Sequence, residues 1–383
     1  MQERGRPLAD VQAALRAARA RDTSFGSGRI LGSMCTAPHP VAQEAYRLFL
    51  ESNLGDPHLC PGAKSLEDEA LASLASMLRA PPESKGAFLT GGSEANFMAV
   101  LLALRKRPGR EIVLPESAHF SFDKVASYLG LRQVTARVRA DGTVDVDDVA
   151  ERIGKQTACV VGIAGTTELG AVDDVPALGK LCADLGVPLH VDAAWGGFVL
   201  PFAKRLGRKL PEFDLGVGGV TTLAIDPHKM GLAPIPSGVL FAADGRDWDA
   251  VSVPSPYVSV ERQPSLQGTR PGAAPAATWA VMEHLGAEGY TESLRACLHV
   301  TDHLVAGLRK AGFPPVLDPP PLSIVAFRVA DPVGARRKLR ERGFLLSLAP
   351  LSGGLKVVVG PHVSAAAIDD FLAALPDCAE PVS

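Results

Sequence analysis

The stretch LAIDPHKMGLAPIPSG, residues 223–238, holds one lysine, Lys229, directly after His228. An apolar run leads into this lysine, and a segment containing glycine and two prolines follows it. Apolar strands with polar ends are typical of parallel sheets, which bind ligands at the carboxyl ends of their strands. We therefore predict that Lys229 lies at a sequestered strand end, where burial would make its ammonium group lose a proton more easily than in water.

The residues on both sides of this stretch repeat the same pattern. Apolar strands alternate with segments of helical spacing from about residue 65 to residue 245, which predicts an α/β fold with a mostly parallel, seven-stranded sheet covered by helices. The predicted strands include 111–119, 158–167, 187–197, 220–229 and 237–244, and the predicted helices include 65–80 and 176–186.

The C-terminal third of the chain has a different order. A long helical segment, 273–312, is interrupted near Gly286 and Gly289, and the strands and helices after it follow a β-α-β-β-α order typical of a small α+β domain. We therefore divide the chain into an N-terminal segment (1–55), a large ligand-binding domain (56–270) and a C-terminal helix with a small α+β domain (271–383). The polar segment 253–272 is either a mobile loop over the site or a plain connection.

Composition excludes several classes of protein. The 383 residues carry a net charge of −3, so there is no basic surplus to bind nucleic acid. No stretch approaches the ~20 apolar residues of a membrane span, and the charged N-terminus does not resemble an export signal. Six widely spaced cysteines without a CxxC pair suggest free thiols in the cytoplasm and no zinc site, so we predict no metal.

Polar residues at the predicted strand ends suggest one ligand when they are taken together. A Gly91-Gly92-Ser93 turn at a helix start favours an anion, Asp192 suits a cationic ring nitrogen, and Lys229 can bind an aldehyde. His119 and Thr167 end two further strands. Each residue alone also has a structural reading: a helix cap, a bridging aspartate, a satisfied histidine or an ion-paired lysine. Together they describe pyridoxal 5′-phosphate, which has a phosphate, a pyridine nitrogen and an aldehyde.

Five motifs in this order resemble the group II pyridoxal-phosphate-dependent amino acid decarboxylases of fold type I. They are GGSEAN (91–96), ESAHFSFDKVASYLG (116–130), AGTTELGAVDD (164–174), HVDAAWGG (190–197) and DPHKMG (226–231). Shorter stretches, ILGSMCTAPHP (30–40) and QGTRPGAA (267–274), are similar to archaeal-type L-tyrosine/L-aspartate decarboxylases.

The resemblance implies roles for individual residues. Lys229 matches the lysine that forms a Schiff base with the cofactor, Asp192 matches the partner of the pyridine nitrogen, and His119 matches the histidine that stacks on the ring. Further matches are Ala194 under the ring, Thr167 near its 3′-oxygen, Gly92, Ser93 and His228 at the phosphate, and Tyr257 as a loop residue that protonates the product carbanion. Asp226 departs from the asparagine common in aromatic decarboxylases. An aspartate cannot donate a hydrogen bond to a phosphate, so we expect Asp226 to face a hydrogen-bond donor elsewhere and not to bind the phosphate.

The substrate is less closely specified than the cofactor. Met34, Cys35 and Thr36 are candidates to line the side-chain pocket, and Arg270 either binds a substrate carboxylate or forms a structural salt bridge. The resemblance favours L-aspartate or L-tyrosine, with L-glutamate next. It also implies a homodimer with the site at the subunit interface.

Two other functions share these motifs. One is a carbon–carbon lyase of the sphingosine-phosphate-lyase type, although such lyases usually carry a membrane anchor. The other is a non-catalytic relative that binds pyridoxal phosphate, against which the intact Lys229, Asp192 and His119 argue. A tRNA-dependent cysteine-forming enzyme would need a basic face that the net charge does not support.

Overall fold

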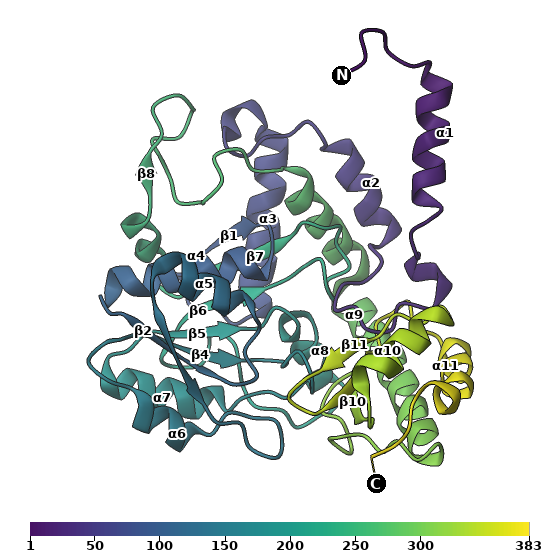
Figure 1. The fold of residues 1–383 in the computed structure, drawn as a ribbon. Coiled ribbons are helices and arrows are strands. Elements are labelled where there is room, and N and C mark those ends of the chain that lie inside the picture. The colour runs from purple at the N-terminus through teal and green to yellow at the C-terminus, as the bar shows by residue number, and fades with distance from the viewer. Residues whose placement is uncertain (383) are drawn as a thin grey trace.

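A seven-stranded sheet lies at the centre of the computed structural model, which describes residues 1–382 (Figure 1). Its strands are β1 (Lys85–Leu89), β2 (Glu111–Pro115), β3 (Arg132–Ala136), β4 (Thr157–Ile163), β5 (Leu189–Asp192), β6 (Val220–Ile225) and β7 (Gly238–Ala242). Their order is β1-β7-β6-β5-β4-β2-β3, and only β7 runs antiparallel to its neighbours. The predicted mostly parallel sheet of fold type I is confirmed.

Helices cover both faces of this sheet, so its central strands are buried. Every residue of β4 and β5 is buried. In Figure 1, α4 (Gly92–Lys106) and α5 (Ser121–Leu129) lie on one face, and α6 (Val146–Arg152) and α7 (Val175–Leu185) lie on the other. The short α8 (Leu200–Arg205) and the 3₁₀ turns Phe25–Ser27, Pro57–Leu59, Gly196–Phe198 and Gly245–Ala250 complete the connections.

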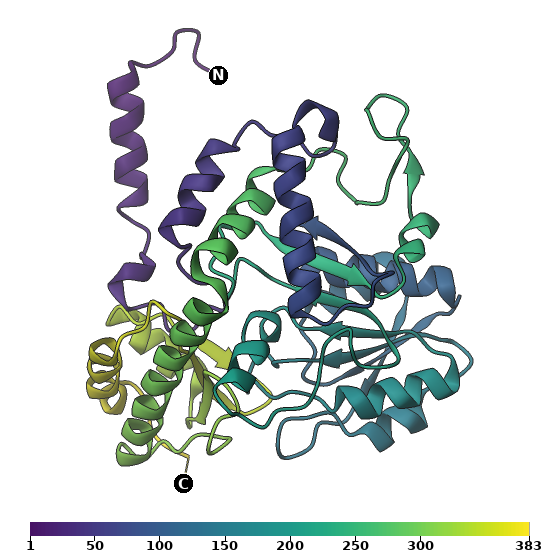
Figure 2. The same ribbon diagram turned by 180° about the vertical axis from the view of Figure 1, so that it is seen from behind.

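A long helix joins the two parts of the molecule. Helix α9 (Ala273–Lys310) is interrupted at Gly286, where φ is 55° and ψ is −173°, at one of the two glycines where an interruption was expected. Figure 2 shows α9 running from the large domain, beside α2 (Pro40–Leu48) and α3 (Pro61–Met77), to the small domain. The N-terminal helix α1 (Leu8–Arg19) stands apart from the body and buries no residue.

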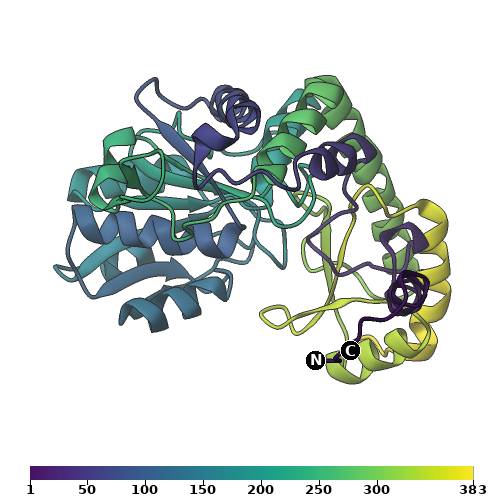
Figure 3. The ribbon, with the colours of Figure 1, turned by 90° about the horizontal axis from the view of Figure 1, so that it is seen from above.

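The small domain has the predicted β-α-β-β-α order. It consists of β10 (Ile324–Arg328), α10 (Pro332–Glu341), β11 (Ser347–Ala349), β12 (Gly354–Val358) and α11 (Ala365–Cys378), with an antiparallel sheet in the order β10-β12-β11. The N-terminal segment also reaches it, because the backbone of Leu31 bonds to both Leu345 (2.9 Å) and Val358 (2.7 Å). Seen from above in Figure 3, residues before α2 cross the small domain. The domain boundaries stay a prediction.

The connecting segment 253–272 contains a short hairpin of β8 (Val253–Pro254) and β9 (Arg262–Gln263). Its tip projects from the body near the upper edge of Figure 1. Across residues 1–382 no helix is both long and apolar enough to cross a membrane.

Candidate active site

A cavity of about 400 Å³ opens at the carboxyl ends of β4, β5 and β6, beside the start of α4. This volume suits a small organic ligand. Every residue predicted to bind the cofactor lines it, namely Gly92, Ser93, His119, Thr167, Asp192, Ala194, His228 and Lys229, together with Met34 and Cys35. The topology therefore brings residues that lie far apart in the sequence, from Met34 to Lys229, to one cavity.

The glycine turn before α4 leaves backbone donors free at the cavity wall. Gly91 is the residue before the helix, and no side chain caps the helix start, so Ser93 is not the ordinary cap considered above. Gly91 has φ 153° and ψ 179°, a conformation that side chains rarely adopt. A Cβ on Gly238 would lie 2.4 Å from the Cα of Gly91, so only glycine permits this close approach. The turn is built to take an anion.

Lys229 lies in the turn after β6, with its ammonium group paired to Asp226. The Nζ of Lys229 is 3.1 Å from Oδ2 of Asp226, which is 2% exposed. Burial lowers the pKa of Lys229, but the charges of Asp226 and Asp192 outweigh burial, so the pKa is raised. Our expectation that this lysine loses its proton more easily than in water is therefore wrong, because two carboxylates face it.

Asp192 is held at the end of β5 by two donors. Its Oδ1 accepts from the backbone N–H of Ala194 (3.0 Å), and its Oδ2 accepts from Nδ2 of Asn96 (2.9 Å). The side chain is 7% exposed, so these bonds fix it in a largely dry environment. A carboxylate held in this way suits a cationic nitrogen in the cavity.

His119 follows β2 and presents one nitrogen to the cavity. Its Nδ1 accepts from the backbone N–H of Ser121 (3.2 Å). Burial lowers the pKa of His119, so the ring is neutral at pH 7 and its hydrogen is on Nε2. The histidine can therefore stack on a planar ligand and donate or relay a proton through Nε2.

A loop after β4 ties the cavity to the small domain. The Nζ of Lys356 donates to the carbonyl oxygen of Thr167 (2.6 Å), and the carboxylate of Glu168 accepts from the backbone N–H groups of Leu351 (3.0 Å) and Ser352 (3.2 Å). Burial lowers the pKa of Lys356 to about 8. Thr167 is thus positioned by residues almost 190 positions further along the chain.

The groups around the cavity, several of them without partners, fit pyridoxal phosphate. Among the described residues, Oε1 of Glu94, Nε1 of Trp195 and Oδ1 of Asp226 are buried, lack a hydrogen bond and belong to residues that line this cavity. Groups of this kind are rare unless a ligand or water completes them. Free N–H donors for a phosphate, a carboxylate for a ring nitrogen and a lysine amine for an aldehyde surround the same space. The residues fit the cofactor.

Three predicted residues lie outside this cavity's lining. Thr36 is 3% exposed, and its hydroxyl donates to the carbonyl oxygen of Lys229 (2.6 Å), so it supports the lysine backbone and does not face substrate. Tyr257 is 96% exposed on the tip of the β8–β9 hairpin.

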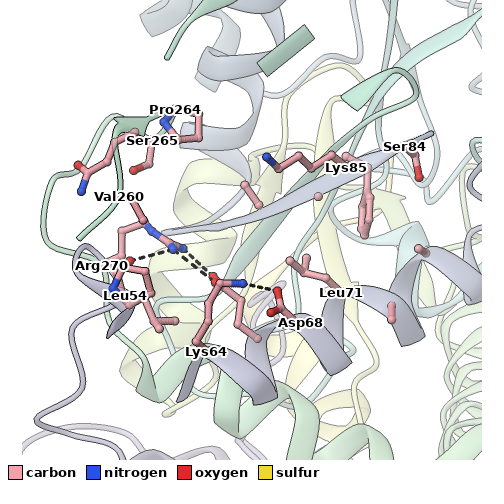
Figure 4. A pocket seen from close by; sticks show the side chains of 18 of the residues that line it. Leu54, Lys64, Asp68, Leu71, Ser84, Lys85, Val260, Pro264, Ser265 and Arg270 are labelled. Carbon is pink, nitrogen blue, oxygen red and sulfur yellow. Dashed lines mark hydrogen bonds and ion pairs between the residues drawn. The ribbon is translucent and has the colours of Figure 1, made fainter. Parts of the chain in front are cut away.

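Arg270 lines a second cavity, of about 430 Å³, between α3, β1 and the hairpin (Figure 4). Its guanidinium donates to Oε1 of Glu67 (2.6 Å) and to the carbonyl oxygen of Leu54 (3.1 Å). The geometry is the structural salt bridge that was the alternative for this residue.

Sequence reasoning did not identify several residues around the cavity. Asn96 contacts Asp192, and His190 lies behind it, while Trp195 and Glu94 line the wall. Asn96 carried one usable signal, since it is a polar residue within an apolar helical run, ANFMAVLLAL. Asp226 was expected to face a donor other than phosphate, and the structure identifies that donor as Lys229.

Comparison with known sequences gives one family. The model of the pyridoxal-dependent decarboxylase conserved domain matches residues 52–330. The probable L-tyrosine/L-aspartate decarboxylase of Methanothermobacter thermautotrophicus is 45% identical, over 89% of this chain and 94% of that protein. The L-aspartate/L-glutamate decarboxylase of Pyrococcus horikoshii is 43% identical over 92% of both, and the L-aspartate decarboxylase of Thermococcus kodakarensis is 42% identical over 99% of both.

Solved structures agree on the fold. The sphingosine-1-phosphate lyase of Burkholderia pseudomallei superposes with a TM-score of 0.90 and 28% identity, covering 99% of this chain and 92% of that one. The glutamate decarboxylase of Lactobacillus brevis gives a TM-score of 0.89 at 21% identity, covering 99% of this chain and 93% of that one, which supports the fold alone.

Proposed function

This chain belongs to the pyridoxal-dependent decarboxylase family and is a pyridoxal-phosphate-dependent carboxy-lyase of amino acids; we propose that its substrate is L-aspartate or L-tyrosine, with L-glutamate next. The observation that carries the proposal is the cavity where Lys229, Asp192 and the free N–H groups before α4 converge. The activities for which the relatives are named support this choice of substrates.

Different residues of the cavity would hold different parts of the cofactor. When bound, pyridoxal phosphate supplies an electron sink for the pair of electrons left as the substrate's carboxylate departs. Lys229 would hold its aldehyde carbon, Asp192 its ring nitrogen, and the Gly92–Ser93 turn with His228 its phosphate. Thr167 would lie near its 3′-oxygen, and Ala194 and His119 would lie on opposite faces of the ring. Asp226 pairs with the Lys229 ammonium before the lysine loses its proton and binds the aldehyde.

His119 is our candidate within this chain for returning a proton to the substrate's Cα. It lines the cavity, and its Nε2 carries the exchangeable hydrogen because Nδ1 is occupied by the N–H of Ser121. A positioned acid of this kind typically contributes ~10²–10⁴-fold to a rate. Met34 and Cys35 line the same cavity and are proposed to contact the substrate side chain.

Carbon dioxide release from each of the twenty amino acids tests the substrate proposal. We expect release with L-aspartate or L-tyrosine to exceed that with the other amino acids, with L-glutamate the next best. Met34 and Cys35 supply apolar and thiol surface at the cavity wall, where a substrate side chain would lie. Turnover confined to an amino acid outside these three would refute the proposal.

Carbon–carbon lyase activity is the alternative, favoured by the similarity to the Burkholderia lyase. A lyase of that type would release an aldehyde from a phosphorylated amino alcohol without forming carbon dioxide. The curated relatives at 42–45% identity argue for decarboxylation. Aldehyde formation from a phosphorylated sphingoid base, with no carbon dioxide from any amino acid, would establish the alternative.

We further propose a homodimer in which Tyr257 serves the site of the other copy. Tyr257 is 96% exposed on a projecting hairpin and does not line the cavity of its own chain, so a role in proton return requires a second copy or loop closure. Mixing the Lys229→Ala and Tyr257→Phe variants separates these cases. If Tyr257 acts across copies, mixed dimers regain one complete site and recover activity, whereas action within one chain gives no recovery.

A cytoplasmic location is part of the proposal. Within the described residues all six cysteines are free thiols, and four of them are buried. Thiols persist in a reducing compartment. Partition of the tagged protein into an oxidising compartment would contradict this.

A further inference from the structure

A chain of hydrogen bonds runs behind Asp192, away from the cavity. It begins at the hydroxyl of Thr222, which lies 3.0 Å from Nδ1 of His190. The Nε2 of His190 lies 3.0 Å from Oδ1 of Asn96, and Nδ2 of Asn96 lies 2.9 Å from Oδ2 of Asp192. Thr222, His190 and Asn96 are all less than 5% exposed.

The direction of every bond in this chain follows from its last member. The Asp192 carboxylate accepts, so Asn96 must present its NH₂ group to it and its carbonyl oxygen to His190. That oxygen needs a donor, so His190 carries its hydrogen on Nε2. The Nδ1 of His190 then has a lone pair, which accepts from the Thr222 hydroxyl. Burial lowers the pKa of His190 to about 4, which agrees with this neutral ring.

Each bond fixes the next one. Without the Thr222 hydroxyl, Nδ1 of His190 loses its donor, and only the carbonyl oxygen of Asn96 still holds the ring with its hydrogen on Nε2. The ring and the Asn96 amide are then held less firmly, and so is the bond from the amide to Asp192. If the Asn96 donor is lost, Oδ2 of Asp192 loses the bond that orients it, and the backbone N–H of Ala194 holds the carboxylate through Oδ1. The charge of Lys229 and the titratable rings of His119 and His190 lie close to this carboxylate.

We propose that Thr222, His190 and Asn96 are positioning residues that aim the Asp192 carboxylate at the cofactor's ring nitrogen and so keep that nitrogen protonated. The inference rests on the proposed role of Asp192 in holding the cofactor. Thr222 does not line the cavity, so it acts on the cofactor indirectly, and the chain of bonds links its hydroxyl to Asp192.

The matched pair Thr222→Val and Thr222→Ser tests the proposal. Valine keeps the shape and removes the hydroxyl, whereas serine keeps the hydroxyl. Cofactor affinity is measured by titration with pyridoxal phosphate, and ring protonation by the ¹⁵N chemical shift of cofactor labelled at the ring nitrogen. We expect Thr222→Val to weaken binding of the cofactor roughly tenfold and to move the ¹⁵N shift toward the unprotonated value. The reason is that loss of the bond from Thr222 weakens the hydrogen bond that Asn96 donates to the charged Asp192. Thr222→Ser should restore both.

A second pair tests the chain nearer to Asp192. Asn96→Ala removes the donor to Asp192, while Ser121→Ala removes only the hydroxyl that accepts the other Nδ2 hydrogen of Asn96 (3.0 Å). We expect the larger effect, roughly 10- to 100-fold in cofactor affinity with a ¹⁵N shift change, from Asn96→Ala alone.

The outcomes separate this inference from the proposed function. A fall in melting temperature with an unchanged ¹⁵N shift in both Thr222→Val and Asn96→Ala would show that the residues are merely structural and would overturn the proposal. If the wild-type chain binds pyridoxal phosphate with a protonated ring nitrogen, the proposed function stands whatever the variants do. If the wild-type chain binds none, both fail together.

Discussion

Two cavities of similar size each hold a half-buried cation paired with a buried carboxylate, and they differ in how completely that pair is satisfied. In the second cavity Arg270 donates to both oxygens of Glu67 and to the carbonyl of Leu54 (Figure 4). In the cavity at the strand ends Lys229 has one carboxylate oxygen at 3.1 Å, and the other oxygen of Asp226 has no partner. A saturated pair stabilises the fold, whereas an incomplete one leaves groups available to a ligand.

The largest effect is expected from removing the cation of the incomplete pair. Lys229→Ala should abolish carbon dioxide release and the visible absorbance of bound cofactor, because no other amine in the cavity can hold the aldehyde. Absorbance spectroscopy and single-turnover assays with added pyridoxal phosphate measure both. An unchanged absorbance band in the purified variant would show that Lys229 does not bind the cofactor.

Removing the cation of the saturated pair should affect stability first. Arg270→Ala leaves Glu67, 3% exposed, with Lys64 at 3.7 Å as its remaining ion pair, so we expect the free energy of unfolding to fall by about 3 kcal/mol. Urea denaturation measures this. The double variant Arg270→Met/Glu67→Leu is the control and should recover most of the loss, since no buried charge remains. If the double variant does not recover the free energy of unfolding, and both variants lose turnover, a substrate role for Arg270 would be favoured.

Changing the carboxylate of the incomplete pair should shift the pH dependence of cofactor capture. Capture requires the neutral amine of Lys229, whose pKa is raised because Asp226 and Asp192 outweigh the effect of burial. Asp226→Asn removes one of these charges, so the capture rate should rise at a pH lower by roughly one to three units. Stopped-flow absorbance from pH 6 to 10 measures it, and a profile that does not move would contradict the pairing.

The last effect concerns Lys356, a lysine beside the cavity at the strand ends, whose Nζ donates to the carbonyl oxygen of Thr167 (2.6 Å). Burial lowers its pKa to about 8, so above this pH the folded chain binds fewer protons than the unfolded chain. The free energy of unfolding should therefore rise between about pH 8 and the ordinary lysine pKa near 10.5. Lys356→Met should lack this rise relative to wild type. An identical pH dependence in both proteins would show that the lysine is not buried in solution.

The sequence was enough to predict what depends on strand order. In a parallel sheet the carboxyl ends meet at one edge, so polar residues that follow apolar strands, such as Thr167, Asp192 and Lys229, were expected to share a site, and the structure places them around one cavity. Fold class, cofactor and reaction type, predicted from these residues and the motifs around them, are confirmed by the family and the fold.

Packing between distant segments decided the rest. The pKa of Lys229 depends on Asp192 from the end of β5 as well as on Asp226, three residues earlier, and the orientation of Asp192 depends on Asn96 from α4. Likewise Thr36 supports Lys229 and Arg270 pairs with Glu67 because folded helices and loops bring them there. A linear sequence fixes which chemical groups exist and at which strand ends they stand. Only the tertiary structure decides which neighbours they meet in a dry interior, where those neighbours control charge and direction.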